Sequence, residues 1–218
     1  MATIGRPAPW QLWTVCGGAR HRRVLPAAGR WHRARPALPG PVRVLHAGDP
    51  GRHPAHNDGL TGVPNRRAWD LELQREMTKA RRSGADVCVA LLDLDHFKRF
   101  NDTFGHQAGD RLLKEASAAW RSLLRPGDTL ARYGGEEFGV LLVGAAPPEA
   151  ARILDRLREV TPHGQSFSAG LVRWDGVEAA DEVVGRADEA LYHAKHNGRN
   201  RVHLVDATPT TRNTRILA

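Results

Sequence analysis

Hydrophobic and polar residues follow two patterns along most of this 218-residue chain. Within 65–82, Trp69, Leu73 and Met77 recur at helical spacing among charged residues, which predicts an amphipathic helix. The run 87–92 is apolar at every position and predicts a strand buried on both faces. The same criteria predict helices at 108–123, 149–160 and 180–196, and strands at 129–133, 138–143, 165–173 and 201–205.

The interleaving of these helices and strands predicts the fold class. We expect one α/β domain, an α+β sandwich in which a mainly antiparallel five-stranded sheet is flanked by helices. Two of its strands surround Gly134-Gly135-Glu136-Glu137. Because glycine permits positive φ angles, this segment predicts a hairpin turn.

The regular pattern starts only after residue 56. Residues 1–56 hold eight of the 14 prolines and show no period, so a packed core is not expected there. A hydrophobic content of 41% is nevertheless enough to give the rest of the chain a core. We expect a disordered basic Pro/Arg-rich arm over 1–56, one folded domain over 57–206 and a frayed tail over 207–218.

The net charge of +8 belongs to the arm. Residues 1–56 contain nine arginines and one acid, Asp49, so the rest of the chain has as many acidic as basic residues. Arginines beside Trp10, Trp13 and Trp31 could contact phosphates and stack on bases. A solvated arm accounts for the same composition, and we do not expect a nucleic-acid partner.

The sequence also bears on the compartment. No stretch reaches the roughly 20 apolar residues of a membrane helix, and the first residues lack the order of a secretory signal. Cys16 and Cys88 form no CxxC pair, which argues against a disulfide framework or a structural zinc site. We therefore expect a cytoplasmic protein with no membrane segment.

Carboxylates gather where the buried strand ends. Asp93 and Asp95 follow the apolar run, where packing does not require them, and the predicted turn adds Glu136 and Glu137. Carboxylates this close repel one another unless a cation bridges them, and Mg²⁺ prefers oxygen ligands shared with phosphates. The pattern therefore predicts a metal-phosphate site.

Five motifs together resemble the diguanylate cyclases of the GGDEF family. The stretch 132–138 contains the GGEEF variant of the signature, Gly134 to Phe138. The other four motifs lie at 58–67, 93–102, 105–110 and 190–201. The resemblance implies a nucleotidyl-cyclase fold, similar to a polymerase palm, in which two GTP molecules condense into cyclic di-GMP and two pyrophosphates. Each subunit of a homodimer would hold one GTP.

The same resemblance assigns the site residues. Mg²⁺, with Mn²⁺ as a possible substitute, would be held by Asp93, Glu136 and the Leu94 carbonyl. Glu137 would assist with metal binding or deprotonation of the ribose 3′-hydroxyl. The guanine edge would be bound by Asn101 and Asp110, and the phosphates by backbone N–H groups of His96, Phe97 and Lys98 and by the side chains of Lys98, Lys195 and Arg199.

A further motif lies outside this set. Arg125 and Asp128 match the RxxD site at which cyclic di-GMP inhibits family members, although the sequence alone also fits an ordinary helix-ending turn. The family usually carries a sensor or coiled-coil helix upstream, where this chain has its Pro-rich arm. Two hypotheses stay open: an active cyclase, and a catalytically idle module that binds GTP or cyclic di-GMP.

Overall fold

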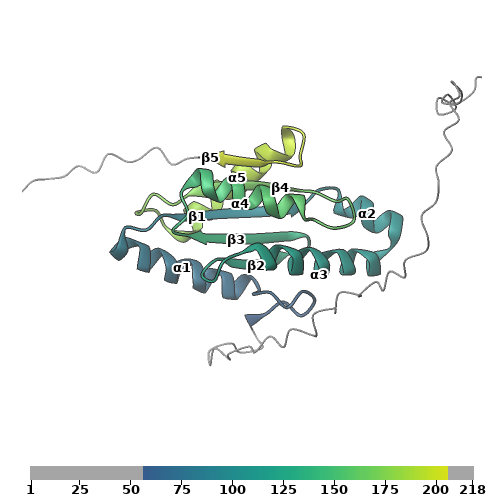
Figure 1. Cartoon of the computed structure of the whole chain (residues 1–218), viewed down its shortest axis with the longest axis horizontal. Helices are drawn as coiled ribbons and strands as arrows, with labels where there is room; N and C mark the ends of the chain where they lie inside the picture. The colour runs from purple at the N-terminus through teal and green to yellow at the C-terminus, as the bar shows by residue number, and fades with distance from the viewer. Residues whose placement is uncertain (1–55, 206–218) are drawn as a thin grey trace, which may run out of the picture. The chain divides into compact units, whose positions relative to one another are not determined.

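The computed structural model describes residues 56–205. Helices and strands are interleaved along this range (Figure 1). The helices are α1 (Arg66–Ser83), α2 (Phe97–Phe104), α3 (His106–Leu123), α4 (Pro147–Glu159) and α5 (Ala180–His196). The strands are β1 (Val87–Leu94), β2 (Thr129–Gly134), β3 (Glu137–Val143), β4 (Phe167–Arg173) and β5 (Val202–Val205).

The five strands form one mixed sheet in the order β2-β3-β1-β4-β5. β1 lies at its centre and pairs antiparallel with β3 and β4. The expected mainly antiparallel sheet is confirmed, and the single parallel pair joins β4 to β5. This register places Asp93 directly opposite Glu137 on one side and Ser168 on the other.

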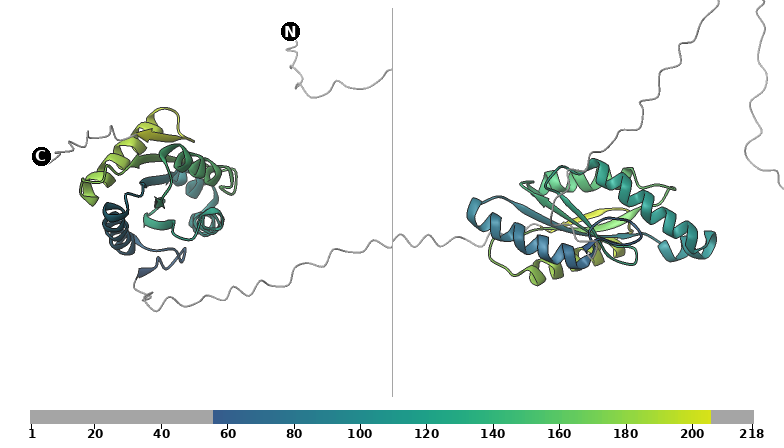
Figure 2. Two further views of the ribbon diagram at one scale, coloured as in Figure 1. Left: turned by 60° about the vertical axis from the view of Figure 1, so that its left-hand side comes forward. Right: turned by 90° about the horizontal axis from the view of Figure 1, so that it is seen from below.

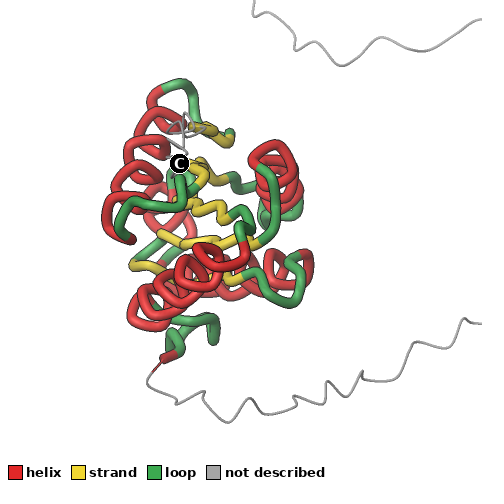
Figure 3. The backbone as a smooth tube through the Cα atoms, turned by 90° about the vertical axis from the view of Figure 1, so that its left-hand side faces the viewer, coloured by secondary structure: helices red, strands yellow, loops and turns green. Residues whose placement is uncertain are grey.

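Helices cover both faces of the sheet, as the expected sandwich requires. Alternate residues of β1 point to opposite faces, so Val89 and Leu91 pack with α1 and α5, while Ala90 and Leu92 pack with α3 and α4. Figure 2 shows these two helix pairs on opposite sides of the sheet, and Figure 3 shows the strands between them. Each layer buries a tryptophan completely, Trp69 in one and Trp120 in the other.

Local signals explain how α1 begins and ends. The Asn65 side chain accepts a hydrogen bond from the Ala68 N–H at 3.1 Å and so caps the first turn. Gly84 ends the helix at a φ of 73°, a left-handed conformation that favours glycine. These boundaries agree with the predicted helix to within one residue at each end.

One helix was not predicted. α2 has only eight residues, so the helical spacing of Phe97, Phe100 and Phe104 extends over just two turns, too short a stretch for the period to identify a helix. It begins after His96, whose φ is 57°, and Gly105 caps its C-terminal end.

The predicted arm and tail lie outside the described residues, apart from His56. Between residues 56 and 205, no helix is long and apolar enough to cross a membrane.

Candidate active site

The ends of three strands bring the predicted carboxylates together. Asp93 lies near the end of β1, opposite Glu137 at the start of β3. The Leu94 N–H donates to the Glu136 carbonyl at 3.4 Å, which places the hairpin turn beside the end of β1. Cross-strand partners lie on the same face, so Asp93 and Glu137 share one side of the sheet.

Asp93 is the carboxylate whose environment is most unusual. Its side chain is 13% exposed, and Oδ2 lies 2.8 Å from the Lys195 Nζ. Burial raises the pKa of Asp93 above its usual 3.8, and the charges of Glu136 and Glu137 add to this rise. Lys195 opposes the increase without cancelling it. The resemblance had assigned Lys195 to phosphates only, and the ion pair with Asp93 was not predicted.

The groups that could bind a metal ion at the end of β1 all present oxygen atoms. Asp93, Glu136 and the Leu94 carbonyl are hard ligands of the kind that Mg²⁺ prefers, and the mutual repulsion felt at Asp93 is what a cation would relieve. These residues therefore fit the ion. As they stand, no three His, Cys, Asp or Glu side chains in the described part of the chain are grouped as a metal site.

Asp95 has a different role from the one its sequence context indicated. We expected packing to have no use for it, but its side chain is buried and accepts three hydrogen bonds. The donors are Ser166 Oγ at 2.6 Å, Ser168 Oγ at 2.7 Å and the Asn200 N–H at 3.0 Å. Asp95 is thus directed toward β4 and the loop after α5, and it was missed because all three partners are distant in sequence.

Arg132 stabilises the hairpin turn between β2 and β3 by hydrogen bonds. Gly135 has a φ of 47°, as the turn prediction required. The Arg132 guanidinium donates to the Gly135 carbonyl at 2.9 and 2.7 Å, and its Nη1 lies 3.0 Å from Asp58 Oδ1. Burial would raise the pKa of Asp58, but hydrogen bonds from Thr61 and Arg132 outweigh it and hold this pKa below 3.8.

The two predicted guanine-binding residues lie on adjacent helices. Asn101 is on α2 and Asp110 on α3, and Gly105 separates the two helices. The Asn101 Oδ1 is buried and has no hydrogen-bond partner within the described residues. A Cβ at Gly109 would lie 1.9 Å from that atom, so glycine at this position makes room for the Asn101 amide. Asp110 is exposed.

The predicted phosphate-binding groups come from two segments. His96 gives α2 no side-chain cap, so the N–H groups of Phe97 and Lys98 have no partner within the helix. Such N–H groups at a helix start favour anions. Arg199 is exposed in the turn after α5, with a φ of 58°, and Lys195 lies in the last turn of that helix.

The RxxD motif lies on a different surface. Arg125 and Asp128 form a turn in which the Arg125 N–H donates to Asp128 Oδ2 at 3.0 Å. Partial burial raises the pKa of Asp128 in spite of this bond. A cavity of about 780 Å³ separates the turn from α1, and its lining includes the cations Arg75, Lys79 and Arg121.

Comparison with known proteins agrees with this geometry. The family model described as "Diguanylate cyclase, GGDEF domain" matches residues 55–201. Diguanylate cyclase DgcP of Pseudomonas aeruginosa is 43% identical over 164 residues, which cover 71% of this chain and 24% of DgcP. Diguanylate cyclase DosC of Escherichia coli K12 is 37% identical over 168 residues, which cover 72% of this chain and 36% of DosC.

A solved structure shares the fold. The GGDEF domain of DgcB from Caulobacter crescentus, determined in complex with c-di-GMP, matches with a TM-score of 0.66 and 37% identity. The match covers 70% of this chain and 97% of that one. The chain thus spans about a quarter to a third of the length of its curated relatives, and nearly all of a solved GGDEF domain. It belongs to the GGDEF-domain family of diguanylate cyclases.

Proposed function

We propose that this protein is an active diguanylate cyclase of the GGEEF type, which condenses two GTP molecules into cyclic di-GMP with release of two pyrophosphates. The observation that carries the proposal is the largely buried Asp93 side chain, which lies among the charges of Glu136 and Glu137 and is paired with Lys195. Repulsion of this kind is unfavourable in an idle domain and useful in one that binds a metal triphosphate.

Asp93, Glu136 and the Leu94 carbonyl would hold Mg²⁺, with Mn²⁺ as a possible substitute, and Glu137 would assist. The bound ion would lower the pKa of the ribose 3′-hydroxyl and spread the charge that develops on the triphosphate. In that state Lys195 would be released from Asp93 to neutralise phosphate oxygens.

The chain's own residues would select and orient GTP. The Asn101 amide would donate to guanine O6, and the Asp110 carboxylate would accept from N1–H and N2–H. Adenine would leave these groups unpaired, which is a strong basis for discrimination. Lys98, Lys195 and Arg199 would neutralise the terminal phosphates, together with the N–H groups from His96 to Lys98.

Each domain offers one such site, so the reaction needs a homodimer in which two sites face each other.

The cavity beside Arg125 and Asp128 would bind the product, since cations line it and the guanine edge can pair with a carboxylate. Inhibition by cyclic di-GMP would follow. A cytoplasmic location and the absence of a nucleic-acid partner belong to the same proposal.

A chromatographic assay for cyclic di-GMP tests the proposal. Purified protein with Mg²⁺ and GTP should form the product, and Glu136→Ala should reduce the rate at least about a hundredfold, in the range found for removal of charge-stabilising groups. Glu189→Ala, a charge removal at an exposed position of α5, is the matched control and should retain full activity.

The same assay over a dilution series tests the dimer. Specific activity should fall as the protein is diluted, because dissociated subunits hold only one GTP each. If GTP binds but no product forms at any protein concentration, the idle binding module replaces the cyclase. If neither GTP nor cyclic di-GMP binds, both functions are wrong.

A further inference from the structure

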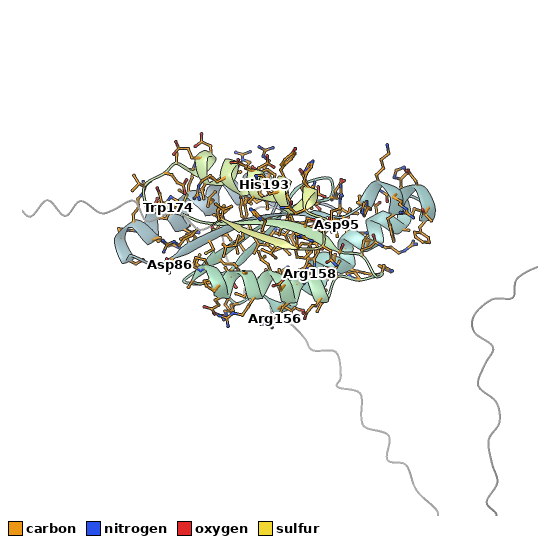
Figure 4. All side chains as sticks on the ribbon, turned by 90° about the horizontal axis from the view of Figure 1, so that it is seen from above. Asp86, Asp95, Arg156, Arg158, Trp174 and His193 are labelled. Atoms are coloured by element: carbon orange, nitrogen blue, oxygen red, sulfur yellow. The ribbon has the colours of Figure 1, made fainter. Side chains whose placement is uncertain are left out.

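Asp95 connects two parts of the chain that are far apart in sequence. Its carboxylate is buried at the end of β1, and its Oδ2 accepts the Asn200 N–H from the loop between α5 and β5. Its own N–H donates to the Ser166 carbonyl at 2.8 Å, so the backbone of Asp95 is held as well. Asp86 precedes β1 and Asp95 follows it, and Figure 4 shows the two residues well apart in the domain.

The loop that Asp95 holds has an unfavourable backbone. Gly198, Arg199 and Asn200 have successive φ values of 103°, 58° and 49°. Two of them are not glycine, and of these Arg199 is in a conformation unfavourable for its side chain, whereas the short polar side chain of Asn200 tolerates it better. A turn of this kind persists only where its surroundings hold it.

Asn200 is held on two sides. Its N–H is bound by Asp95, and its Oδ1 accepts from Arg158 Nη1 of α4 at 2.8 Å. Arg199 makes no comparable side-chain contact in the described part of the chain, and its exposed guanidinium depends on the conformation of this turn. The Arg199 N–H donates to the Ala194 carbonyl at 3.1 Å, so loss of the Asp95 bond would loosen the turn at Asn200 without touching the guanine-binding residues.

Asp95 also precedes the other phosphate-binding segment. The next residue is His96, whose left-handed conformation begins α2. The carboxylate and the backbone of one residue thus fix the start of α2 and the turn of Arg199 relative to each other. We propose that Asp95 is a positioning residue that aligns Arg199 with the start of α2 to bind the terminal phosphates of GTP. This inference rests on the proposed function.

Calorimetric titration of the full chain with two probes tests this role. One probe is GMP, and the other is α,β-methylene-GTP with Mg²⁺, which keeps three phosphates but cannot react. Asp95→Ala should weaken binding of the triphosphate about tenfold, as expected for a lost charge-assisted contact, and leave GMP binding within about twofold. Asp95→Asn should bind with intermediate affinity, because its amide oxygen can still accept the Asn200 N–H.

A double-mutant cycle separates positioning from general damage. In an Arg199→Ala background, Asp95→Ala should add less than about a twofold loss, because both substitutions remove the same contact. Additive losses, or equal losses for GMP and the triphosphate, would overturn the proposal. Asp188→Ala, an acid removed from the exposed face of α5, is the control and should bind both probes normally.

A second variant covers the case in which Asp95→Ala does not fold. Ser166→Ala/Ser168→Ala keeps the carboxylate and removes the two hydroxyls that orient it. It should weaken triphosphate binding about threefold and leave GMP binding unaltered. No loss of triphosphate binding would refute the role of Asp95, whereas a wild-type chain that binds neither probe would refute the GTP site and the proposed function with it.

Discussion

At the scale of single residues, the site depends on where a side chain is missing as well as on where one is present. Gly109 lies in α3, where glycine is normally unfavourable by about 1 kcal/mol relative to alanine. The proximity of the Asn101 Oδ1, 1.9 Å from where a Cβ would be, explains its presence. In the proposed site, guanine recognition would therefore depend on a residue that does not itself contact guanine.

Gly109→Ala tests this explanation. The new methyl group should displace the Asn101 amide and lower kcat/KM for GTP about tenfold or more, because a lost bond to a buried polar group costs about 1–3 kcal/mol. The preference for GTP over ATP should fall with it. Gly185→Ala on α5 has no atom within 4 Å of the new Cβ and should leave both quantities unaltered. A Gly109→Ala enzyme with normal GTP preference would contradict the assignment of Asn101.

At the scale of elements, the β2-β3 hairpin is held in place by the segment before α1. Asp58 binds Arg132, and Arg132 binds the Gly135 carbonyl of the turn. The carboxylate must be ionised for this chain of contacts. Since the folded-state pKa of Asp58 lies below 3.8, the ion pair contributes stability above the unfolded pKa and loses it as the pH falls through the folded value.

Asp58→Asn should therefore destabilise the fold in a pH-dependent way. At pH 7 we expect a loss of about 1–2 kcal/mol in the free energy of unfolding, from weakened hydrogen bonds to Thr61 and Arg132. The difference from the wild type should begin to shrink below about pH 4, near the unfolded pKa, and should disappear only as the pH falls through the lower folded-state pKa of Asp58 and its carboxylate is protonated. Urea unfolding at a series of pH values measures it, and a difference that is constant down to pH 3 would contradict the role of the charge.

At the scale of the whole molecule, the candidate catalytic and product-binding sites use different surfaces. The first lies at the end of β1, and the second lies between α1 and the turn of Arg125. The Arg125 guanidinium is paired with Glu149 of α4 at 2.6 Å, so a product molecule would compete with Glu149 for this arginine. Both side chains are well exposed, and such pairs contribute only about 0.2–1 kcal/mol.

Substitutions of the two partners should shift product inhibition in opposite directions. Arg125→Ala should raise the cyclic di-GMP concentration for half-inhibition about tenfold, because charge-assisted bonds to the product are lost. Glu149→Gln should lower that concentration up to about threefold by freeing the arginine. Arg152→Ala, at an exposed position of α4, is the control. Inhibition curves that coincide for all four proteins would show that this cavity is not the product site.

Local sequence determined the elements and the candidate ligands. The apolar run of β1, the spacing of α1 and the glycine turn each depend on residues within a few positions of one another, and all were predicted. α2 was not predicted, because the spacing of Phe97, Phe100 and Phe104 extends over only two helical turns. The parallel pairing of β5 with β4 was also not predicted, because strand order depends on how distant segments pack.

Tertiary structure decided what the charged residues contact. Asp93 and Asp95 are equivalent in the sequence, yet one is paired with Lys195 among other carboxylates and the other is bound by Ser166, Ser168 and the Asn200 N–H. Asp93 lies within β1 and Asp95 lies just beyond its end, so strand alternation does not set the direction of the second side chain. The partners of the two carboxylates lie 71 to 105 residues away. A carboxylate's charge and position follow from sequence, but its partners follow only from which strands and loops the fold places beside it.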